Sequence, residues 1–282
     1  DPFKKLTTVF QMSEEIFFLH YGKDGCNRHV LIDECRELFG EIYEQIPELP
    51  FCNIWTAMQL SSRLPKGALF HMGVSNTRRC WNMFQLPESV ESACNVGCCG
   101  IDGCVSTLVG ASLVNPDRLC YVVVGDLTFF YDLNSLGNHH IGTNLRVMLV
   151  NNGRGTEFRL GIHHCNVFGD DADKYMAAAG HFGNKSPLLV KHYAEDLGFH
   201  YLSATTKEEF MTALSNFTNP QLSDHSMILE VFTDSKDESE ALYLMSHIQS
   251  DAKGMVRSKL KDAVRNVAGE KGINAIKKIL KK

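Results

Sequence analysis

Two nearly continuous apolar runs constrain the fold of this chain more than any other feature. Residues 119–124 (LCYVVV) and residues 145–150 (LRVMLV) carry hydrophobic side chains at almost every position. Because successive side chains of a strand point to opposite faces, such runs predict strands that are buried on both faces. Strands of that kind lie inside a parallel sheet that helices cover on both sides.

Further strands and helices alternate along the chain. We expect strands at residues 68–73, 119–124, 145–150, 199–203 and 226–232. Apolar residues at helical spacing and helix-ending prolines predict helices at residues 33–46, 55–64, 101–114, 128–136, 187–197 and 207–217. Helices between parallel strands form βαβ units. The sequence therefore predicts an α/β fold, with a central, mainly parallel sheet and helices on both faces.

The two ends of the chain depart from this pattern. Residues 8–12 and 15–20 resemble strands. Residues 251–282 contain ten Lys or Arg and three Asp or Glu, although the whole chain has a net charge of −5. We expect basic amphipathic helices within residues 236–282, because apolar residues recur there at helical spacing. We interpret these helices as packing on the acidic remainder of the chain, and docking on a membrane or a partner is the alternative.

Composition excludes several classes of protein. With 44% hydrophobic and 22% charged residues, the chain has the composition of a globular protein. No run reaches the roughly 18 uncharged apolar residues of a membrane helix, and no overall positive charge favours nucleic acid. Ten cysteines in so large and apolar a chain indicate free thiols in a reducing compartment, so we expect a cytoplasmic protein. Four of them lack the usual spacing of zinc or iron–sulfur ligands, and we interpret these as small buried residues: Cys94, Cys98, Cys99 and Cys104.

Polar residues suited to ligand binding follow the two apolar strands. GDLT (residues 125–128) opens a helix after the first strand, and NNGRGT (residues 151–156) follows the second. Asp126 and Asn152 are 26 residues apart, which is one βαβ unit, so we expect the two strand ends to be neighbours. A carboxylate and a carboxamide supply hard oxygen ligands for Mg²⁺ or Ca²⁺. The helix N-terminus after Leu127 offers free N–H groups to a diphosphate.

Either segment alone is a common turn, but the two together at this spacing indicate a binding site. Neither the G-x-x-x-x-G-K-[ST] loop nor the G-x-G-x-x-G pattern of nucleotide sites occurs in the sequence. A nucleotide is therefore not the expected ligand.

Three segments together resemble the thiamine diphosphate-dependent enzymes. GDLTFFYDLN (residues 125–134) and the later NN pair are similar to the G-D-G…N-N cofactor motif of that family. SNTRRCWNMF (residues 75–84) and NVGCCGIDGCVSTLVGAS (residues 95–112) resemble the cofactor domain of the 2-succinyl-5-enolpyruvyl-6-hydroxy-3-cyclohexene-1-carboxylate synthases of menaquinone biosynthesis. The resemblance covers roughly residues 50–234.

The resemblance implies thiamine diphosphate and Mg²⁺ as cofactors and a 2-keto acid as substrate. Asp126, the side chain of Asn152 and the carbonyl of Arg154 would bind the Mg²⁺ ion. Ile101 would be the apolar wedge that keeps the cofactor bent, so that its aminopyrimidine reaches the thiazolium C2 proton. The implied cofactor-binding set is Ile101, Gly125, Asp126, Leu127, Thr128 and Asn152.

Two departures put the substrate of those synthases in doubt. Val96 and Trp81 stand where the synthases carry arginines that bind acidic substrate groups, and a neutral side chain does not replace a bidentate Arg. Arg78 or Arg79 could substitute, so a different keto acid or acceptor is an equal alternative. The candidate substrate residues are Ser75, Asn76, Arg78 and Arg79. Candidates for a catalytic acid or base follow the metal segment, where the family carries a mobile flap: Glu157, His163 and His164.

The family also needs a glutamate from a pyrimidine-binding domain, and we expect this chain alone to be inactive without it. Residues 1–50 look like the remnant of a preceding middle domain and linker, residues 51–235 like the cofactor domain, and residues 236–282 like basic C-terminal helices. The missing domain would come from a longer chain or a separate subunit, and we expect a homodimer or tetramer. The alternatives are the cofactor-binding subunit of a two-subunit decarboxylase and a non-catalytic assembly module.

Overall fold

The structure is a computed structural model that describes residues 6–22, 30–97, 99–160, 163–176 and 186–248. The chain divides into two compact units, Asp1–Gln45 and Ile46–Lys282. The predicted basic helices lie largely outside the described residues, which end at residue 248.

The first unit contains two helices, α1 (Glu14–Tyr21) and α2 (Val30–Glu44). The strands predicted at residues 8–12 and 15–20 are therefore wrong, whereas the helix predicted at residues 33–46 is confirmed with shifted ends. Ser13 caps α1 by accepting a hydrogen bond from the Ile16 N–H, and two glutamates follow in the first turn. A capping side chain and early acidic residues favour a helix over the strand that the aromatic residues suggested.

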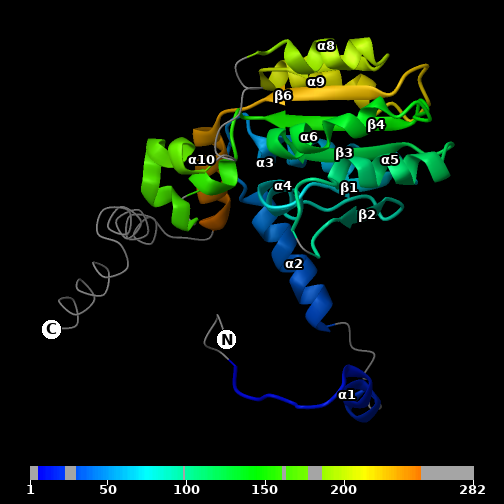
Figure 1. Ribbon diagram of the computed structural model, residues 1–282. Helices are drawn as coiled ribbons and strands as arrows, with labels where there is room; N and C mark the ends of the chain where they lie inside the picture. Colours follow the sequence, from blue (N-terminus) through cyan, green and yellow to red (C-terminus); the bar gives the residue numbers. More distant parts are fainter. Residues whose placement is uncertain (1–5, 23–29, 98, 161–162, 177–185, 249–282) are drawn as a thin grey trace. The chain divides into compact units, whose positions relative to one another are not determined.

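The second unit is built on a six-stranded sheet whose strands all run parallel, in the order β2-β1-β3-β4-β6-β5 (Figure 1). The strands are β1 (Leu69–Met72), β2 (Glu91–Cys94), β3 (Cys120–Gly125), β4 (Leu145–Asn151), β5 (His200–Ala204) and β6 (Met227–Phe232). The five predicted strands are confirmed. The edge strand β2 was not predicted, because its sequence ESAC is short and mostly exposed and carries no apolar run.

Helices connect and cover the strands. They are α3 (Asn53–Leu60), α4 (Asn76–Trp81), α5 (Cys104–Val114), α6 (Asp126–Asp132), α7 (Ala172–Tyr175), α8 (Leu189–Asp196), α9 (Lys207–Phe217) and α10 (Ser235–Ser246). Short 3₁₀ segments are η1 (Ser61–Arg63), η2 (Leu133–Gly137), η3 (Thr156–Arg159) and η4 (His164–Asp171). The predicted helices of this unit are confirmed within a few residues, and α4 and α7 are additional. α10 lies at the start of residues 236–282, where helices were expected, but it is acidic and not basic.

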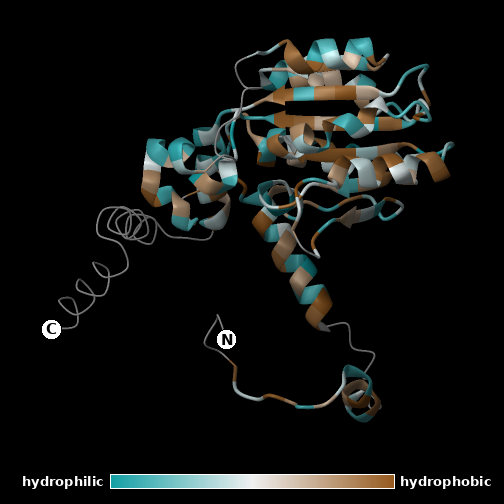
Figure 2. Ribbon diagram, viewed as in Figure 1, coloured by the Kyte–Doolittle hydropathy of each residue, from teal (hydrophilic) through white to brown (hydrophobic). Residues whose placement is uncertain are grey.

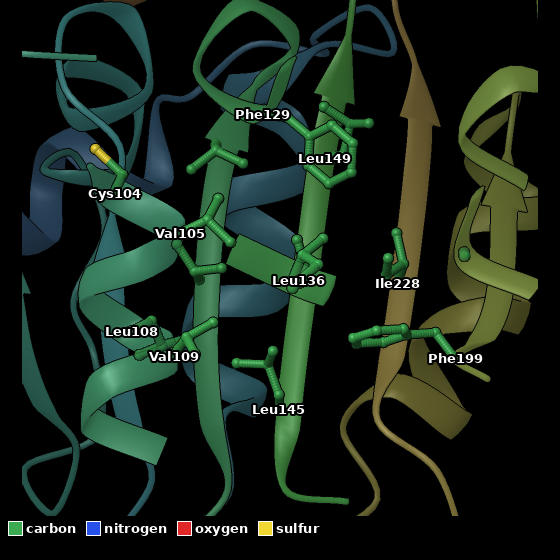
Figure 3. Packing of buried hydrophobic residues seen from close by; sticks show 14 of the residues in the cluster. Cys104, Val105, Leu108, Val109, Phe129, Leu136, Leu145, Leu149, Phe199 and Ile228 are labelled. Carbon is green, nitrogen blue, oxygen red and sulfur yellow. The ribbon is translucent and has the colours of Figure 1, made fainter. Parts of the chain in front are cut away.

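One face of the sheet packs against α5, α6 and α8. Alternate residues of β3 and β4 lie in this core with Val105 and Leu108 of α5, Phe129 of α6 and Val190 of α8. Figure 3 shows Val105 and Leu108 of α5 directed at the neighbouring strands, and Phe129 beside Leu149. The alternation along β3 places every second residue on this face.

The opposite face carries α3, α4 and α9, which are held by aromatic contacts. Tyr121 of β3 lies 5.5 Å from Phe217 of α9 between ring centroids, and its hydroxyl donates to the Phe217 carbonyl. Phe70 of β1 similarly contacts Trp81 of α4 at 5.1 Å. Helices thus cover both faces, as predicted, and the central strands are predominantly hydrophobic (Figure 2).

The cysteines of the described residues are free thiols. Of the four-cysteine segment, Cys104 is buried and Cys94 half-buried, but Cys99 is exposed, so its predicted burial is wrong. Cys99 lies in a loop at a φ of 54°, before α5 begins at Cys104. Cys98 lies outside the described residues. No helix in the described part of the chain is long and apolar enough to cross a membrane.

Candidate active site

The ends of β3 and β4 meet at one edge of the sheet. Gly125 of β3 pairs with Val150 of β4, so the residues that follow each strand leave the sheet side by side. The predicted neighbourhood of Asp126 and Asn152 is confirmed, since both line one pocket of about 140 Å³. Parallel α/β sheets commonly bind ligands at this carboxyl edge.

The pocket draws on five segments of the chain. Its walls come from the start of α3, the loop before α4 and its first turn, the loop before α5, the β3–α6 junction and the loop after β4. The lining residues are Asn53, Val74, Ser75, Asn76, Thr77, Ile101, Gly125, Asp126, Leu127, Thr128, Val150, Asn152, Arg154, Gly155, Thr156, Glu157 and Phe158.

Asp126 is the first residue of α6 and is only 3% exposed. Its Oδ1 accepts a hydrogen bond from the Leu127 N–H at 2.8 Å. The Leu127 amide, expected to be free for a diphosphate, is therefore engaged by the neighbouring carboxylate. Thr128, also buried, lines the pocket one residue further along α6.

The loop after β4 turns sharply at Gly153, whose φ of 79° is a conformation that favours glycine. Asn151 stabilises this turn, because its Oδ1 accepts from the Gly153 N–H at 3.1 Å. The turn places Asn152 and Arg154 at the pocket. The sequence NNG therefore forms a specific bent loop rather than a continuation of the strand.

Three buried oxygen atoms of lining residues have no hydrogen-bond partner within the described part of the chain. They are Oδ1 of Asn152, Oδ1 of Asn76 and Oγ1 of Thr156. Buried polar atoms in native proteins nearly always have a partner, whether protein, water or ligand. Their concentration in one pocket is typical of a site built to bind a polar group.

The donor set at the pocket suits a hard divalent cation. Asp126, Asn152 and Arg154 line it together. Carboxylate, side-chain amide and backbone carbonyl oxygens are the ligands that Mg²⁺ accepts alongside phosphate and water. The Arg154 carbonyl also accepts a hydrogen bond from the Thr156 N–H at 2.8 Å. No group of three or more His, Cys, Asp or Glu that could hold a metal occurs among the described residues. The residues present thus fit a cation shared with a phosphate-bearing ligand rather than a metal held by protein side chains alone.

Ile101 and Gly125 shape the apolar part of the pocket. Ile101 is half-buried, lines the pocket and also packs against the hydrophobic core. A Cβ atom added at Gly125 would have only the Thr77 Oγ1, at 4.0 Å, as a neighbour within contact range. The space in front of Gly125 is therefore open for a ligand.

Ser75 and Asn76 line the pocket before and at the start of α4. Ser75 has a φ of 59° and a ψ of −123°, which is rare for a residue with a side chain. Such a conformation costs on the order of 1–3 kcal/mol and concentrates at functional sites. The strain supports a binding role for this turn, in keeping with its prediction as a substrate segment.

Arg79 and Glu157 form a bidentate ion pair, of which only Glu157 lines the pocket. The Arg79 guanidinium donates to both carboxylate oxygens of Glu157, at 2.8 and 3.0 Å, and both side chains are partly buried, with exposed fractions of 32% and 23%. The hydrogen bonds to Glu157 raise the pKa of Arg79, so the group stays cationic. Glu157 itself lines the pocket, whereas Arg78 is exposed. Arg79 and Glu157 were both predicted from the sequence as candidate site residues, but their ion pair was not predicted.

Comparison with known proteins identifies the family. The chain is 32% identical over 242 residues to the 2-succinyl-5-enolpyruvyl-6-hydroxy-3-cyclohexene-1-carboxylate synthase of Bacteroides fragilis, covering 84% of this chain and 41% of that protein. The synthase of Phocaeicola vulgatus is 32% identical over 250 residues, covering 86% and 42%. That of Christiangramia forsetii is 33% identical over 199 residues, covering 71% and 33%. The chain belongs to the thiamine diphosphate-dependent enzyme family. No family model matches the chain.

The chain thus spans about two fifths of the length of the first two relatives. Trp81 and Val96, which stand where the synthases carry arginines, have different surroundings in the structure. Trp81 is 1% exposed, and its indole Nε1 donates to Asn53 Oδ1 at 3.0 Å, so it is a core residue that supports a pocket wall. Val96 is 41% exposed and does not line the pocket.

The two histidine candidates do not line the pocket, although the His163 ring contacts the lining residue Phe158, with ring centroids 5.3 Å apart. His163 directly precedes η4 and caps it, since its Nδ1 accepts from the Cys165 N–H at 3.1 Å. His164 is exposed. Arg159 bonds the Gly169 carbonyl and the Asp173 carboxylate, which ties η3 to the segment that follows. Of the three catalytic candidates, the structure brings only Glu157 to the pocket.

Several contributors to the site were missed from the sequence. Asn53, Thr77, Thr156 and Phe158 line the pocket. Asn53 and Phe158 lie outside the motif segments, and Thr77 and Thr156 lie within them but are common residue types that were not singled out. Glu230 was also missed, although a carboxylate inside the apolar strand MILEVF is a readable signal. A charged residue in a strand that is otherwise buried requires a compensating partner.

Proposed function

We propose that this chain is the cofactor-binding part of a thiamine diphosphate- and Mg²⁺-dependent enzyme that decarboxylates a 2-keto acid and transfers the product to an acceptor. The observation that carries the proposal is the shared pocket of Asp126, Asn152 and Arg154 at two adjacent strand ends. The similarity to the synthases supports the same assignment.

In this proposal each pocket residue has a defined task. Asp126, the free Oδ1 of Asn152 and the carbonyl of Arg154 hold the Mg²⁺ that neutralises the diphosphate. Ile101, which packs against the core and lines the pocket, would be the apolar contact for the cofactor. When bound, thiamine diphosphate supplies the electron sink for decarboxylation.

The proposed substrate is an acidic 2-keto acid. The half-buried guanidinium of Arg79 has the geometry to bind a carboxylate with two hydrogen bonds, as it binds Glu157 here. The Glu157 carboxylate and the substrate carboxylate would then compete for the Arg79 guanidinium. The keto acids that bind would be those whose carboxylate displaces Glu157.

The proposed active site is completed by a glutamate from a pyrimidine-binding domain, in the same longer chain or a separate subunit. The mass of the natural polypeptide distinguishes the two arrangements, since a single-chain enzyme would be about twice as long as this sequence.

The test is isothermal titration calorimetry with Mg²⁺ and thiamine diphosphate on the complete assembly that contains this chain. Because losing a supporting partner of a metal ligand weakens binding about 10–100-fold, we expect Asp126→Ala to weaken it by about 100-fold or more. Asp117→Ala, an exposed residue at the opposite end of the sheet, is the charge-matched control. Unchanged affinity in Asp126→Ala would contradict the metal assignment, and no binding by the wild type would favour the assembly module.

A further inference from the structure

A buried carboxylate lies in the sheet beside the metal-binding loop. Glu230 of β6 is 1% exposed in a strand that is otherwise apolar. Burial raises the pKa of its carboxyl group. Taking a carboxylate out of water costs several kcal/mol unless hydrogen bonds compensate, so its partners indicate why the residue is there.

Both oxygens of Glu230 accept short hydrogen bonds from neighbouring strands. The Asn151 Nδ2 of β4 donates to Oε1 at 2.7 Å, and the Tyr201 hydroxyl of β5 donates to Oε2 at 2.7 Å. Glu230 pairs in register with Leu149 and Ser203, and Asn151 and Tyr201 each lie two residues from those positions. The three side chains therefore line one face of three adjacent strands.

The network continues into the loop that carries the metal candidates. With its Nδ2 on Glu230, Asn151 directs its Oδ1 at the Gly153 N–H, at 3.1 Å. This bond closes the turn that presents Asn152 and Arg154 to the pocket. The carboxylate fixes which end of the Asn151 amide faces the loop, because it accepts only from the NH₂ group.

We propose that Glu230 is a positioning residue, which sets the conformation of the 152–154 loop through Asn151 and thereby the affinity of the site for a divalent cation with a diphosphate. The inference rests on the proposed function of the pocket. A positioning role for Glu230 and a merely structural role have different measurable consequences. A structural carboxylate affects the stability of the sheet, whereas a positioning residue affects ion binding beyond any change in stability.

The experiment measures Mn²⁺ binding to the 282-residue chain in the presence of inorganic pyrophosphate, by electron paramagnetic resonance. This probe occupies only the diphosphate half of the site and does not need the pyrimidine domain. We expect Glu230→Leu to weaken Mn²⁺ binding by about 10-fold or more, as loss of an outer partner of a metal ligand does. Glu230→Gln should stay within about 3-fold, because its Oε1 still accepts from Asn151 and its Nε2 can donate to Tyr201.

Two further variants separate positioning from stability. Asn151→Ala cuts the same link and should cause a similar loss, and the double variant with Glu230→Leu should lose little more than either alone. Tyr121→Phe removes a buried tyrosine hydrogen bond on the opposite face of the sheet, so it should lower the unfolding temperature without changing Mn²⁺ affinity. A folded Glu230→Leu chain with wild-type affinity, or losses that multiply in the double variant, would overturn the proposal.

A second readout is independent of any ligand. Hydrogen exchange of the Gly153 amide reports its bond to Asn151, and we expect exchange about 10-fold faster in Glu230→Leu but unchanged in Glu230→Gln. Unchanged exchange in a folded Glu230→Leu chain overturns the positioning role. If the wild-type chain fails to bind Mn²⁺ with pyrophosphate, the proposed function fails, while Gly153 exchange still decides the role of Glu230.

Discussion

Glu238 of α10 predicts an unusual dependence of stability on pH. Its carboxyl group is 1% exposed, and its Oε1 accepts from the Asn53 N–H at 3.0 Å and from the Thr233 hydroxyl at 2.8 Å. Burial is the main cause that raises its pKa from 4.5 to about 7, and the charges of Asp126 and Asp237 add to it. The folded chain therefore retains a proton that the unfolded chain has lost.

The sign follows from proton linkage. Between pH 4.5 and 7 the folded state binds more protons than the unfolded state at this carboxyl, so the free energy of unfolding falls as the pH rises. The stabilisation is fully present below pH 4.5 and is lost above pH 7. A shift of about 2.5 pH units corresponds to about 3 kcal/mol, of which about 2 kcal/mol is lost between pH 5 and 8.

We expect Glu238→Gln to remove this contribution and to flatten the pH profile relative to the wild type. The assay is urea unfolding at pH 5, 6, 7 and 8, followed by the fluorescence of the two tryptophans. Trp81 bonds Asn53 directly and Trp55 lies in α3, so both report on the region that Glu238 contacts. Glu240→Gln, an exposed change on the same helix, is the charge-matched control. A Glu238→Gln profile as steep as that of the wild type between pH 5 and 7 would refute the reasoning.

Three other predictions follow from the site and the core. Arg79→Lys should raise the KM of the assembled enzyme for its keto acid by about 10-fold or more without changing cofactor affinity, because Lys cannot form the bidentate pair. An equal loss of cofactor affinity would contradict a role of Arg79 in binding the substrate. Trp81→Phe should lower the free energy of unfolding by about 1–3 kcal/mol in urea titrations, since it leaves Asn53 Oδ1 without its buried donor. Burial raises the pKa of Cys52 to about 12 and the pKa values of Cys104 and Cys120 to about 11. Iodoacetamide should therefore modify the exposed Cys35 and Cys99 before these buried thiols, as mapped by mass spectrometry. Labelling of Cys52 as fast as that of Cys99 would disprove the burial argument.

The central sheet was predictable because burial on both faces leaves a direct trace in sequence. The runs that became β3 and β4 carry apolar side chains at successive positions, and only a doubly covered strand accommodates them. The edge strand β2 buries little and leaves no such trace. In α1, a local capping interaction at Ser13 decided the structure against the β propensity of its aromatic residues.

The part of the site that could be predicted from the sequence is the part whose residues lie in short motifs directly after a strand. Asp126 and Asn152 each follow a recognisable strand, so their position at one edge could be derived from the chain order. The pairs that support the pocket were not predictable in this way. Arg79 and Glu157 are separated by 78 residues, and Asn53 and Glu238 by 185, and only the folded sheet brings each pair together.

The last strand and the helix after it hold two walls of the pocket in place. Glu230 of β6 is bonded to Asn151, and through it to the loop of Asn152. Glu238 of α10 binds the backbone of Asn53, which lines the opposite part of the pocket. Each carboxylate is buried and therefore costly without partners, yet each accepts two hydrogen bonds. At least one donor to each comes from an element distant in sequence. Replacing Glu230 or Glu238 with an apolar residue should thus weaken ligand binding, even though neither side chain lines the pocket.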